Sequence, residues 1–202
     1  MGQTGGSGSG SRSIRLLRSG IPPDRQAGSG RTVAEAFRGE FNQKVDAKAR
    51  VLIPVAFRRV LDAGDPAEGQ RTRFVMVYGD ERRKFVECYT MAEMARLEDA
   101  IILMPRGSVE RRVLERNFIT LSVTVEIDDD GRIVLPTRVR EKLGMAADEI
   151  KGSVEAVFAG ALDTFQIWKR DAFEANLAAL EAEDMALLAD GRDMLTLLPP
   201  KV

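Results

Sequence analysis

Two stretches of this chain repeat each other at a fixed distance, and this internal repeat limits the possible fold more than any other feature of the sequence. The first stretch runs from Val45 to Leu61 and the second from Ile127 to Leu143. A chain with such a repeat folds from two copies of one supersecondary unit. The matched residues, each 82 positions apart, are Asp46 and Asp128, Arg50 and Arg132, Pro54 and Pro136, Arg58 and Arg140, and Leu61 and Leu143.

Each unit shows the same order of local signals. Alternating apolar residues over 41–45 and 121–127 predict a strand. A turn with Asp and Arg four residues apart follows, then three aliphatic residues, and then a proline that opens a helix, where its missing N–H is not needed. Gly144 is expected to end the second of these helices. Further strands are predicted at 73–78 and 85–89 in the first unit, and at 152–158 and 164–168 in the second.

Neither unit is large enough to close a core alone, so we expect the two to pack together. The predicted fold is α+β, a pseudo-two-fold β-barrel with flanking helices. The predicted segments are a head at 1–32, a first unit at 37–90, connecting helices at 91–118, a second unit at 119–169, and a C-terminal helix and tail at 170–202.

Two helix starts outside the repeat carry recognisable signals. Ser108 is a predicted N-cap for a helix over 109–118. Asp171 followed by Glu174 is typical of a capping box, and it predicts that the last helix begins there. Beyond Asp184 the apolar period is lost, so we expect the end of the chain to fray.

Composition excludes several classes of function. The 202 residues include no histidine, which excludes the imidazole-dependent hydrolases and the usual zinc sites. Cys88 is the single cysteine, and it lies in an apolar strand where we expect it to pack. The longest apolar run is far shorter than a membrane span. We therefore expect a cytoplasmic protein without a metal site.

Charge is unevenly distributed along the chain. Residues 1–32 contain eight glycines, six serines and five arginines, a composition typical of disorder. This head is interpreted either as a basic arm or as sequence translated upstream of the native start. The remaining residues carry 25 basic and 30 acidic side chains. Any site for a polyanion must therefore be a local cluster.

The duplicated strand, Asp-x-x-x-Arg turn, strand and proline helix resembles the MraZ family of bacterial transcriptional regulators, which is built from two AbrB-like (SpoVT-AbrB) swapped-hairpin units. The family usually has glycine at the position of Ala49. If that position needs a positive φ, alanine costs about 1 kcal/mol there. The residues that carry the resemblance are Phe37 to Glu40, Asp46 to Arg50, Ile53-Pro54, the segment beginning at Met104-Pro105, Asp128 to Arg132, Leu135-Pro136 and Phe165 to Trp168.

This resemblance implies a cytoplasmic, nucleoid-associated transcription factor that represses its own promoter at the start of the division and cell-wall gene cluster. It implies a ring of eight or twelve chains that binds G-rich direct repeats in double-stranded DNA. It implies no cofactor and no catalytic residue.

The residues of the first turn suit DNA. A guanidinium such as that of Arg50 can face guanine O6 and N7 in the major groove. Lys48 and Arg38 suit phosphate, which positions a protein without reading sequence. Asp46 is expected to orient Arg50, and Arg58 and Arg59 are candidates for phosphate contact or for a solvated helix face.

The second turn is expected to be structural. Three consecutive acids, beginning at Asp128, precede Arg132 and would repel DNA. A plainer interpretation of both turns is a surface ion pair worth under about 1 kcal/mol. For the four arginines between Arg106 and Arg116, which alternate with Glu110 and Glu115, we favour helix ion pairs or a contact between subunits over DNA.

Two other classes of function remain open. Related barrels include self-processing decarboxylases, which need a strained Gly-Ser pair such as Gly107-Ser108 or Gly152-Ser153. No basic and tyrosine cluster accompanies either pair. The second alternative is a ring that docks a protein partner, for example an rRNA methyltransferase.

Overall fold

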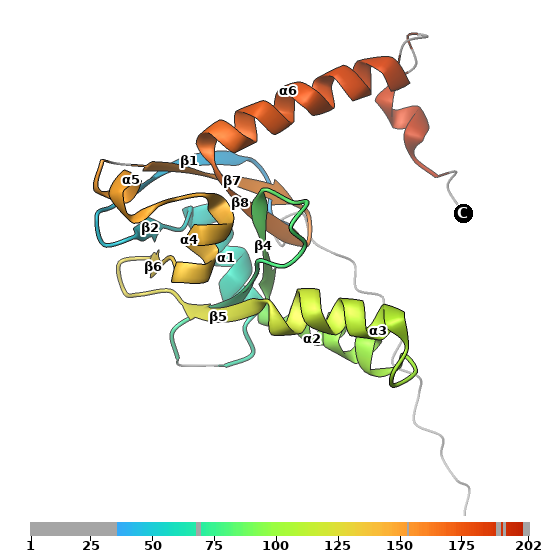
Figure 1. Ribbon diagram of the computed structural model, residues 1–202, viewed down its shortest axis with the longest axis horizontal. Helices are drawn as coiled ribbons and strands as arrows, with labels where there is room; N and C mark the ends of the chain where they lie inside the picture. Colours follow the sequence, from blue (N-terminus) through green and yellow to red (C-terminus); the bar gives the residue numbers. More distant parts are fainter. Residues whose placement is uncertain (1–35, 68–69, 153, 189–190, 192, 200–202) are drawn as a thin grey trace, which may run out of the picture. The chain divides into compact units, whose positions relative to one another are not determined.

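Both repeats fold into a strand, a turn, a short strand and a helix. In the computed structural model the described residues are 36–67, 70–152, 154–188, 191 and 193–199. The predictions for the head at 1–32 therefore lie outside the described residues. The first repeat forms β1 (Glu40–Val45), β2 (Arg50–Leu52) and α1 (Val55–Ala63), and the second forms β5 (Ser122–Glu126), β6 (Arg132–Val134) and α4 (Thr137–Leu143) (Figure 1).

A proline precedes each of these helices, and a glycine follows the second. Pro54 and Pro136 stand immediately before α1 and α4, one position earlier than the sequence predicts. Gly144 follows α4 with φ 67°, in the left-handed region that glycine tolerates, so the predicted helix end is confirmed.

The short strands β2 and β6 pair with each other and join the two repeats. Val51 lies opposite Ile133 in this antiparallel pair. Two flanking bonds continue it: Ile53 N–H donates to Gly131 O at 2.9 Å, and Leu135 N–H donates to Ala49 O at 2.9 Å. These two bonds are equivalent under the 82-residue offset. Each repeat therefore satisfies backbone groups of the other.

The long strands form one antiparallel sheet in the order β1-β7-β8-β4-β3-β5. Its other members are β3 (Arg73–Val77), β4 (Phe85–Thr90), β7 (Val154–Ala161) and β8 (Thr164–Lys169). Strand β1 of the first repeat pairs with β7 of the second, with Phe41 opposite Phe158. Strand β5 pairs with β3, with Val123 opposite Met76. Applying the 82-residue offset to either pair generates the other.

This sheet is open, whereas the sequence predicts a closed barrel. Among the described residues, β1 and β5 are the two edges and form no ladder with each other, so there is no closed barrel. The strands β2 and β6 contain three residues each and pair with each other, not with the two edges. A proline follows each strand after one further residue, and proline cannot donate to a ladder. The two short strands therefore form a separate ribbon and do not join the edges.

The largest hydrophobic core among the described residues contains side chains of both units, so the two pack together as expected. Phe57 of α1 contacts Phe37 and Phe165, with ring centroids 5.3 and 5.1 Å apart. Ile53 and Leu135, which precede the two prolines, are buried in the same cluster. Cys88 is also buried there, as predicted, and burial raises the pKa of its thiol.

The connecting helices are α2 (Met91–Ile102) and α3 (Val109–Leu114), and α3 continues into a π-helix, η2 (Glu115–Thr120). Ser108 caps α3 by accepting a hydrogen bond from Arg111 N–H at 3.2 Å, which confirms the predicted cap. The Arg111 side chain donates to Ile102 O at 3.1 Å and to Met104 O at 2.9 Å. These bonds hold the start of α3 against the end of α2.

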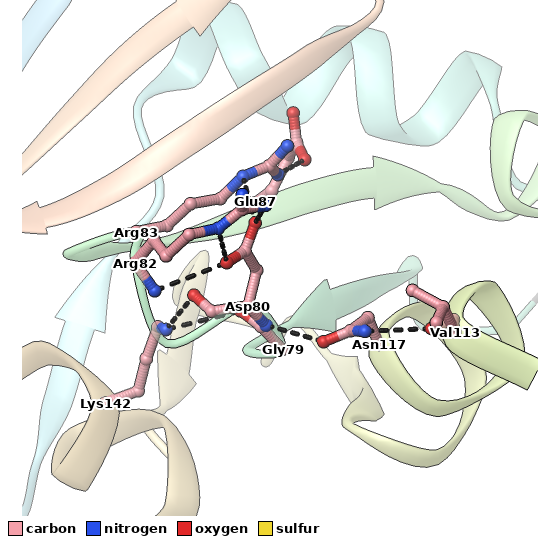
Figure 2. A network of polar contacts seen from close by, with 8 residues as sticks. All are labelled: Gly79, Asp80, Arg82, Arg83, Glu87, Val113, Asn117 and Lys142. Atoms are coloured by element: carbon pink, nitrogen blue, oxygen red, sulfur yellow. Dashed lines mark hydrogen bonds and ion pairs between the residues drawn. The ribbon is translucent and has the colours of Figure 1, made fainter. Parts of the chain in front are cut away.

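A polar network fixes the loop between β3 and β4 to both neighbouring helices (Figure 2). Lys142 of α4 donates to Asp80 O at 2.7 Å and to Gly79 O at 3.2 Å. From η2, Asn117 accepts a hydrogen bond from Asp80 N–H at 2.8 Å. A Cβ atom at Gly79 would overlap Asn117 O, so only glycine allows this approach.

The C-terminal part contains α5 (Ala147–Lys151), α6 (Arg170–Leu187) and the 3-10 helix η3 (Met194–Leu197). Helix α6 follows β8 directly (Figure 1). The predicted capping box at Asp171 is wrong, because α6 begins at Arg170 and Glu174 pairs with that arginine at 2.8 Å. Within the described residues, no helix has the length and hydrophobicity to cross a membrane.

A buried carboxylate holds the connection between α1 and β3. Asp65 accepts hydrogen bonds from Arg73 N–H at 2.8 Å, from Arg73 Nη2 at 3.0 Å and from Ala67 N–H at 3.1 Å. Its side chain is only 3% exposed. The Arg73 hydrogen bonds lower the pKa of Asp65 to about 2.

We expect Asp65→Asn to lower the free energy of unfolding at pH 7 by about 2 kcal/mol. The folded carboxyl has a lower pKa than the usual 3.8, so its stabilisation is complete above about pH 4 and disappears as the pH falls toward 2. Urea unfolding at several pH values measures this difference. Asp129→Asn is the matched control, because the Asp129 side chain in its ion pair with Arg71 is 85% exposed. Equal losses for the two variants at pH 7 would contradict the assignment.

Candidate nucleic-acid interface

The turn between β1 and β2 is organised by the carboxylate of Asp46. Its Oδ1 accepts hydrogen bonds from Lys48 N–H at 2.8 Å and from Arg50 N–H at 2.9 Å, and its Oδ2 accepts one from Arg50 Nε at 2.8 Å. The bonds from Arg50, with that from Lys48, lower the pKa of Asp46. Asp46 therefore shapes the turn and holds the Arg50 side chain with the same carboxylate.

The Arg50 side chain is held at one nitrogen and open at the other two. Nε is occupied by Asp46, while Nη1 and Nη2 have no hydrogen-bond partner in the described part of the chain. The side chain is 38% exposed. A guanidinium fixed through Nε keeps its two terminal nitrogens available for an external pair of acceptors.

Ala49 takes a left-handed conformation, which favours glycine. Its φ is 61°, and the equivalent Gly131 in the second turn has φ 78°. The alanine methyl group is buried. The expected cost of about 1 kcal/mol for alanine therefore applies to this position.

The second turn has the same backbone but a different side-chain arrangement. Asp128 Oδ1 accepts from Asp130 N–H at 3.0 Å and from Arg132 N–H at 2.8 Å, as Asp46 does in the first turn. The Arg132 side chain, however, lies 3.7 Å from Asp130, with no bond to Asp128. Asp129 and Asp130 are 85% and 75% exposed. This turn presents negative charge to the solvent.

The structure does not gather all the predicted site residues in one place. Lys48 and Arg50 share the first turn, but Arg38 precedes β1 at its opposite end, roughly 20 Å of strand away. Arg58 and Arg59 line a cavity of about 530 Å³ together with residues of the second turn. A Cβ atom at Gly131 would overlap Arg58 Nη1, so that guanidinium lies directly against the acidic turn.

The helix beside the first turn is α4 of the other repeat. Ala49 O accepts the hydrogen bond from Leu135 N–H, which places the start of α4 next to this turn. Arg140 of α4 is therefore a further basic residue on the helix beside this turn, whereas Arg138 pairs with Glu141 at 3.2 Å and lines a cavity beside the β3–β4 loop. Arg140 is the repeat counterpart of Arg58 and, like it, has a buried Nε without a hydrogen-bond partner among the described residues. The repeat contains the signal for Arg140, because exchanging the helices between the units places the counterpart of Arg58 beside the first turn.

Comparison with known proteins gives one consistent family. A family model described as "MraZ protein, putative antitoxin-like" matches residues 118–193. A protein of Cereibacter sphaeroides is 59% identical over 167 residues, covering 82% of this chain and 97% of its own length. A protein of Ruegeria pomeroyi is 44% identical over 165 residues, covering 81% and 90%. One of Lachnoclostridium phytofermentans is 31% identical over 140 residues, covering 69% and 86%. All three are named transcriptional regulator MraZ.

We expect Gly131→Ala to lower the free energy of unfolding by about 1–3 kcal/mol, because it places a methyl group at positive φ and against Arg58. Thermal or urea unfolding measures the change. Gly152→Ala is the control, since Gly152 has φ −89° and its Cβ would meet Glu149 O at an ordinary 3.4 Å. A Gly131→Ala protein as stable as the control would show that Arg58 does not pack on this turn.

Proposed function

The chain belongs to the MraZ family of transcriptional regulators, as the sequence resemblance predicted, and from this premise we propose that it regulates transcription by binding double-stranded DNA through the β1–β2 turn. One observation carries the proposal: Asp46 fixes Arg50 through Nε, while both terminal nitrogens stay open on an exposed turn. Two parallel N–H donors match O6 and N7 of guanine, and such a pair discriminates between bases by about 1–3 kcal/mol. Arg50 is accordingly the base-reading residue.

Phosphate contacts come from both repeats. Lys48 N–H is bonded to Asp46, but its ammonium group is exposed on the same turn. Arg140 belongs to α4, whose start the bond between Leu135 and Ala49 holds next to this turn. A composite surface of this kind positions the duplex without reading its sequence. Arg58 and Arg59 are less suited to this role because they line a cavity with Asp128 and Asp129.

The exchanged pairings of β1 with β7 and of β5 with β3 support the inference that the two units are AbrB-like swapped hairpins. The acidic second turn supports a structural role for Asp128 and Arg132, because exposed carboxylates repel phosphate. We thus assign DNA binding to the first turn and a structural role to the second, although their backbones are similar.

Binding by one chain is expected to be weak. The chain offers one basic turn on a body with more acidic than basic residues. A ring that repeats the turn along one rim raises the effective concentration and gains roughly 10² to 10⁴ in affinity. We therefore propose that the chain assembles into a ring. Following the family resemblance, we also propose that the ring binds G-rich direct repeats, represses its own promoter at the start of the division and cell-wall gene cluster, and is associated with the nucleoid.

We expect Arg50→Ala to abolish the specific gel shift of DNA taken from upstream of the protein's own gene, with little change in thermal stability. Arg132→Ala is the matched control, because it removes the equivalent arginine from the acidic turn. The control should retain at least half of the wild-type affinity. An unchanged shift for Arg50→Ala would remove this residue from the interface.

If several copies of the turn bind DNA together, the affinity should depend on the number of repeats in the DNA. Upstream DNA with all its repeats intact should bind at least 10²-fold more tightly than DNA in which a single repeat is kept and the others are scrambled. Gel-shift titration at fixed salt measures the ratio, with mass photometry of the same samples. Equal affinities for the two DNAs would contradict binding by an assembly.

A further inference from the structure

Helix α6 carries an apolar stripe that the rest of the described chain does not cover. Phe173, at its start, contacts Trp168 with ring centroids 5.9 Å apart. Beyond Asn176 the helix is exposed on all sides as far as Leu187. Leu177, Leu180 and Leu187 continue from Phe173 along one face at helical spacing and are 43%, 45% and 56% exposed.

The exposed part of α6 packs on nothing in the described part of the chain. It spans about 11 residues and continues a helix of 18 residues whose start is packed against Trp168. Helices in proteins gain most of their stability by packing an apolar face. A surface that covered the stripe would therefore stabilise the second half of α6.

A second uncovered apolar surface lies where α2 passes into α3. It consists of Ile102, Leu103, Val109 and Val113, which are between 45% and 86% exposed, and we call it the α2–α3 surface. The hydrogen bonds from Arg111 to Ile102 O and Met104 O give it a fixed shape. It is preformed and rigid enough to receive a helix.

The charges around the two surfaces are complementary. From Asp171 to Leu187, α6 contains no basic residue, and its exposed part carries Glu181, Glu183 and Asp184. Beside the α2–α3 surface, Arg106, Arg112 and Arg116 are exposed and form no ion pair within the described part of the chain. In contrast, Arg111 is occupied by Glu115 at 2.7 Å.

We propose that α6 of one copy docks on the α2–α3 surface of a second copy. The leucines of α6 cover Ile102, Leu103 and Val113 of the partner, and the α6 acids face its free arginines. Because the two surfaces are different parts of one chain, the contact is head to tail, and such contacts close into rings when the rotation between copies allows it. This inference rests on the proposed assembly of the chain and names the surfaces that produce it.

Cysteine cross-linking tests the contact directly on the full-length chain. Cys88 is buried and is the single cysteine, so an added cysteine is the only reactive thiol at the surface. A tagged Leu180→Cys protein is mixed with an untagged Val113→Cys protein under a mild oxidant such as diamide. We expect a mixed covalent dimer as the main product. Leu180→Cys mixed with Asp129→Cys, placed on the exposed second turn, is the control and should give at least tenfold less dimer.

Charge reversal provides an independent measurement. A triple variant with Glu181→Arg, Glu183→Arg and Asp184→Arg should shift from the assembly mass to single-chain mass in mass photometry at low salt. Combining it with Arg106→Glu, Arg112→Glu and Arg116→Glu should restore the assembly. Reversal of Asp129 and Asp130 is the matched control and should leave the mass unchanged. Circular dichroism confirms that each variant is folded.

The outcomes separate this inference from the proposed function. A wild-type assembly that gives no mixed dimer and is unaffected by charge reversal would overturn the docking site alone and leave the DNA interface intact. A chain that is monomeric at all concentrations would overturn both the docking and the ring, and would assign the two apolar surfaces to a different protein.

Discussion

The exchange of backbone hydrogen bonds between the two repeats is the constraint on which the rest of the structure depends. Ile53 donates to Gly131 O and Leu135 donates to Ala49 O, so each Asp-Arg turn is fastened to the strand and helix of the other repeat. The same exchange appears in the large sheet, where β1 pairs with β7 and β5 with β3. Because buried backbone groups need partners, neither repeat satisfies its own polar groups without the other. The mixed core around Phe57 follows from this arrangement.

The exchange also explains how two similar turns present opposite charge. Each turn is flanked by the helix of the other repeat, so the side chains around it come from two distant parts of the sequence. Around the first turn these are Lys48, Arg50 and the start of α4, the helix that carries Arg140. Around the second they are three aspartates, with Arg58 packed over Gly131. Substitutions in one repeat therefore change the surroundings of the turn in the other.

Local chemistry was predictable from the sequence, whereas spatial partners were not. The strand and helix segments, the cap at Ser108, the left-handed Gly144 and the bond between Asp46 and Arg50 follow from residue type and spacing over a few positions. The open sheet depends on how far the strands twist and on which strands β2 and β6 pair with, which short-range patterns do not encode. For the same reason, the neighbours of Arg58 and Arg140 required the three-dimensional pairing. The roles of the site residues in DNA binding stay predictions.

The pairing of β1 with β7 has a consequence for synthesis on the ribosome. β1 ends at Val45, and its partner strand begins at Val154, so more than one hundred residues must be translated before the first strand of the sheet can find its neighbour. Contacts of such long range form slowly, and waiting strands expose unpaired edges. Nascent chains that stop before β7 thus retain an incomplete sheet. Such fragments expose apolar surface and unpaired strand edges, the features that chaperones recognise.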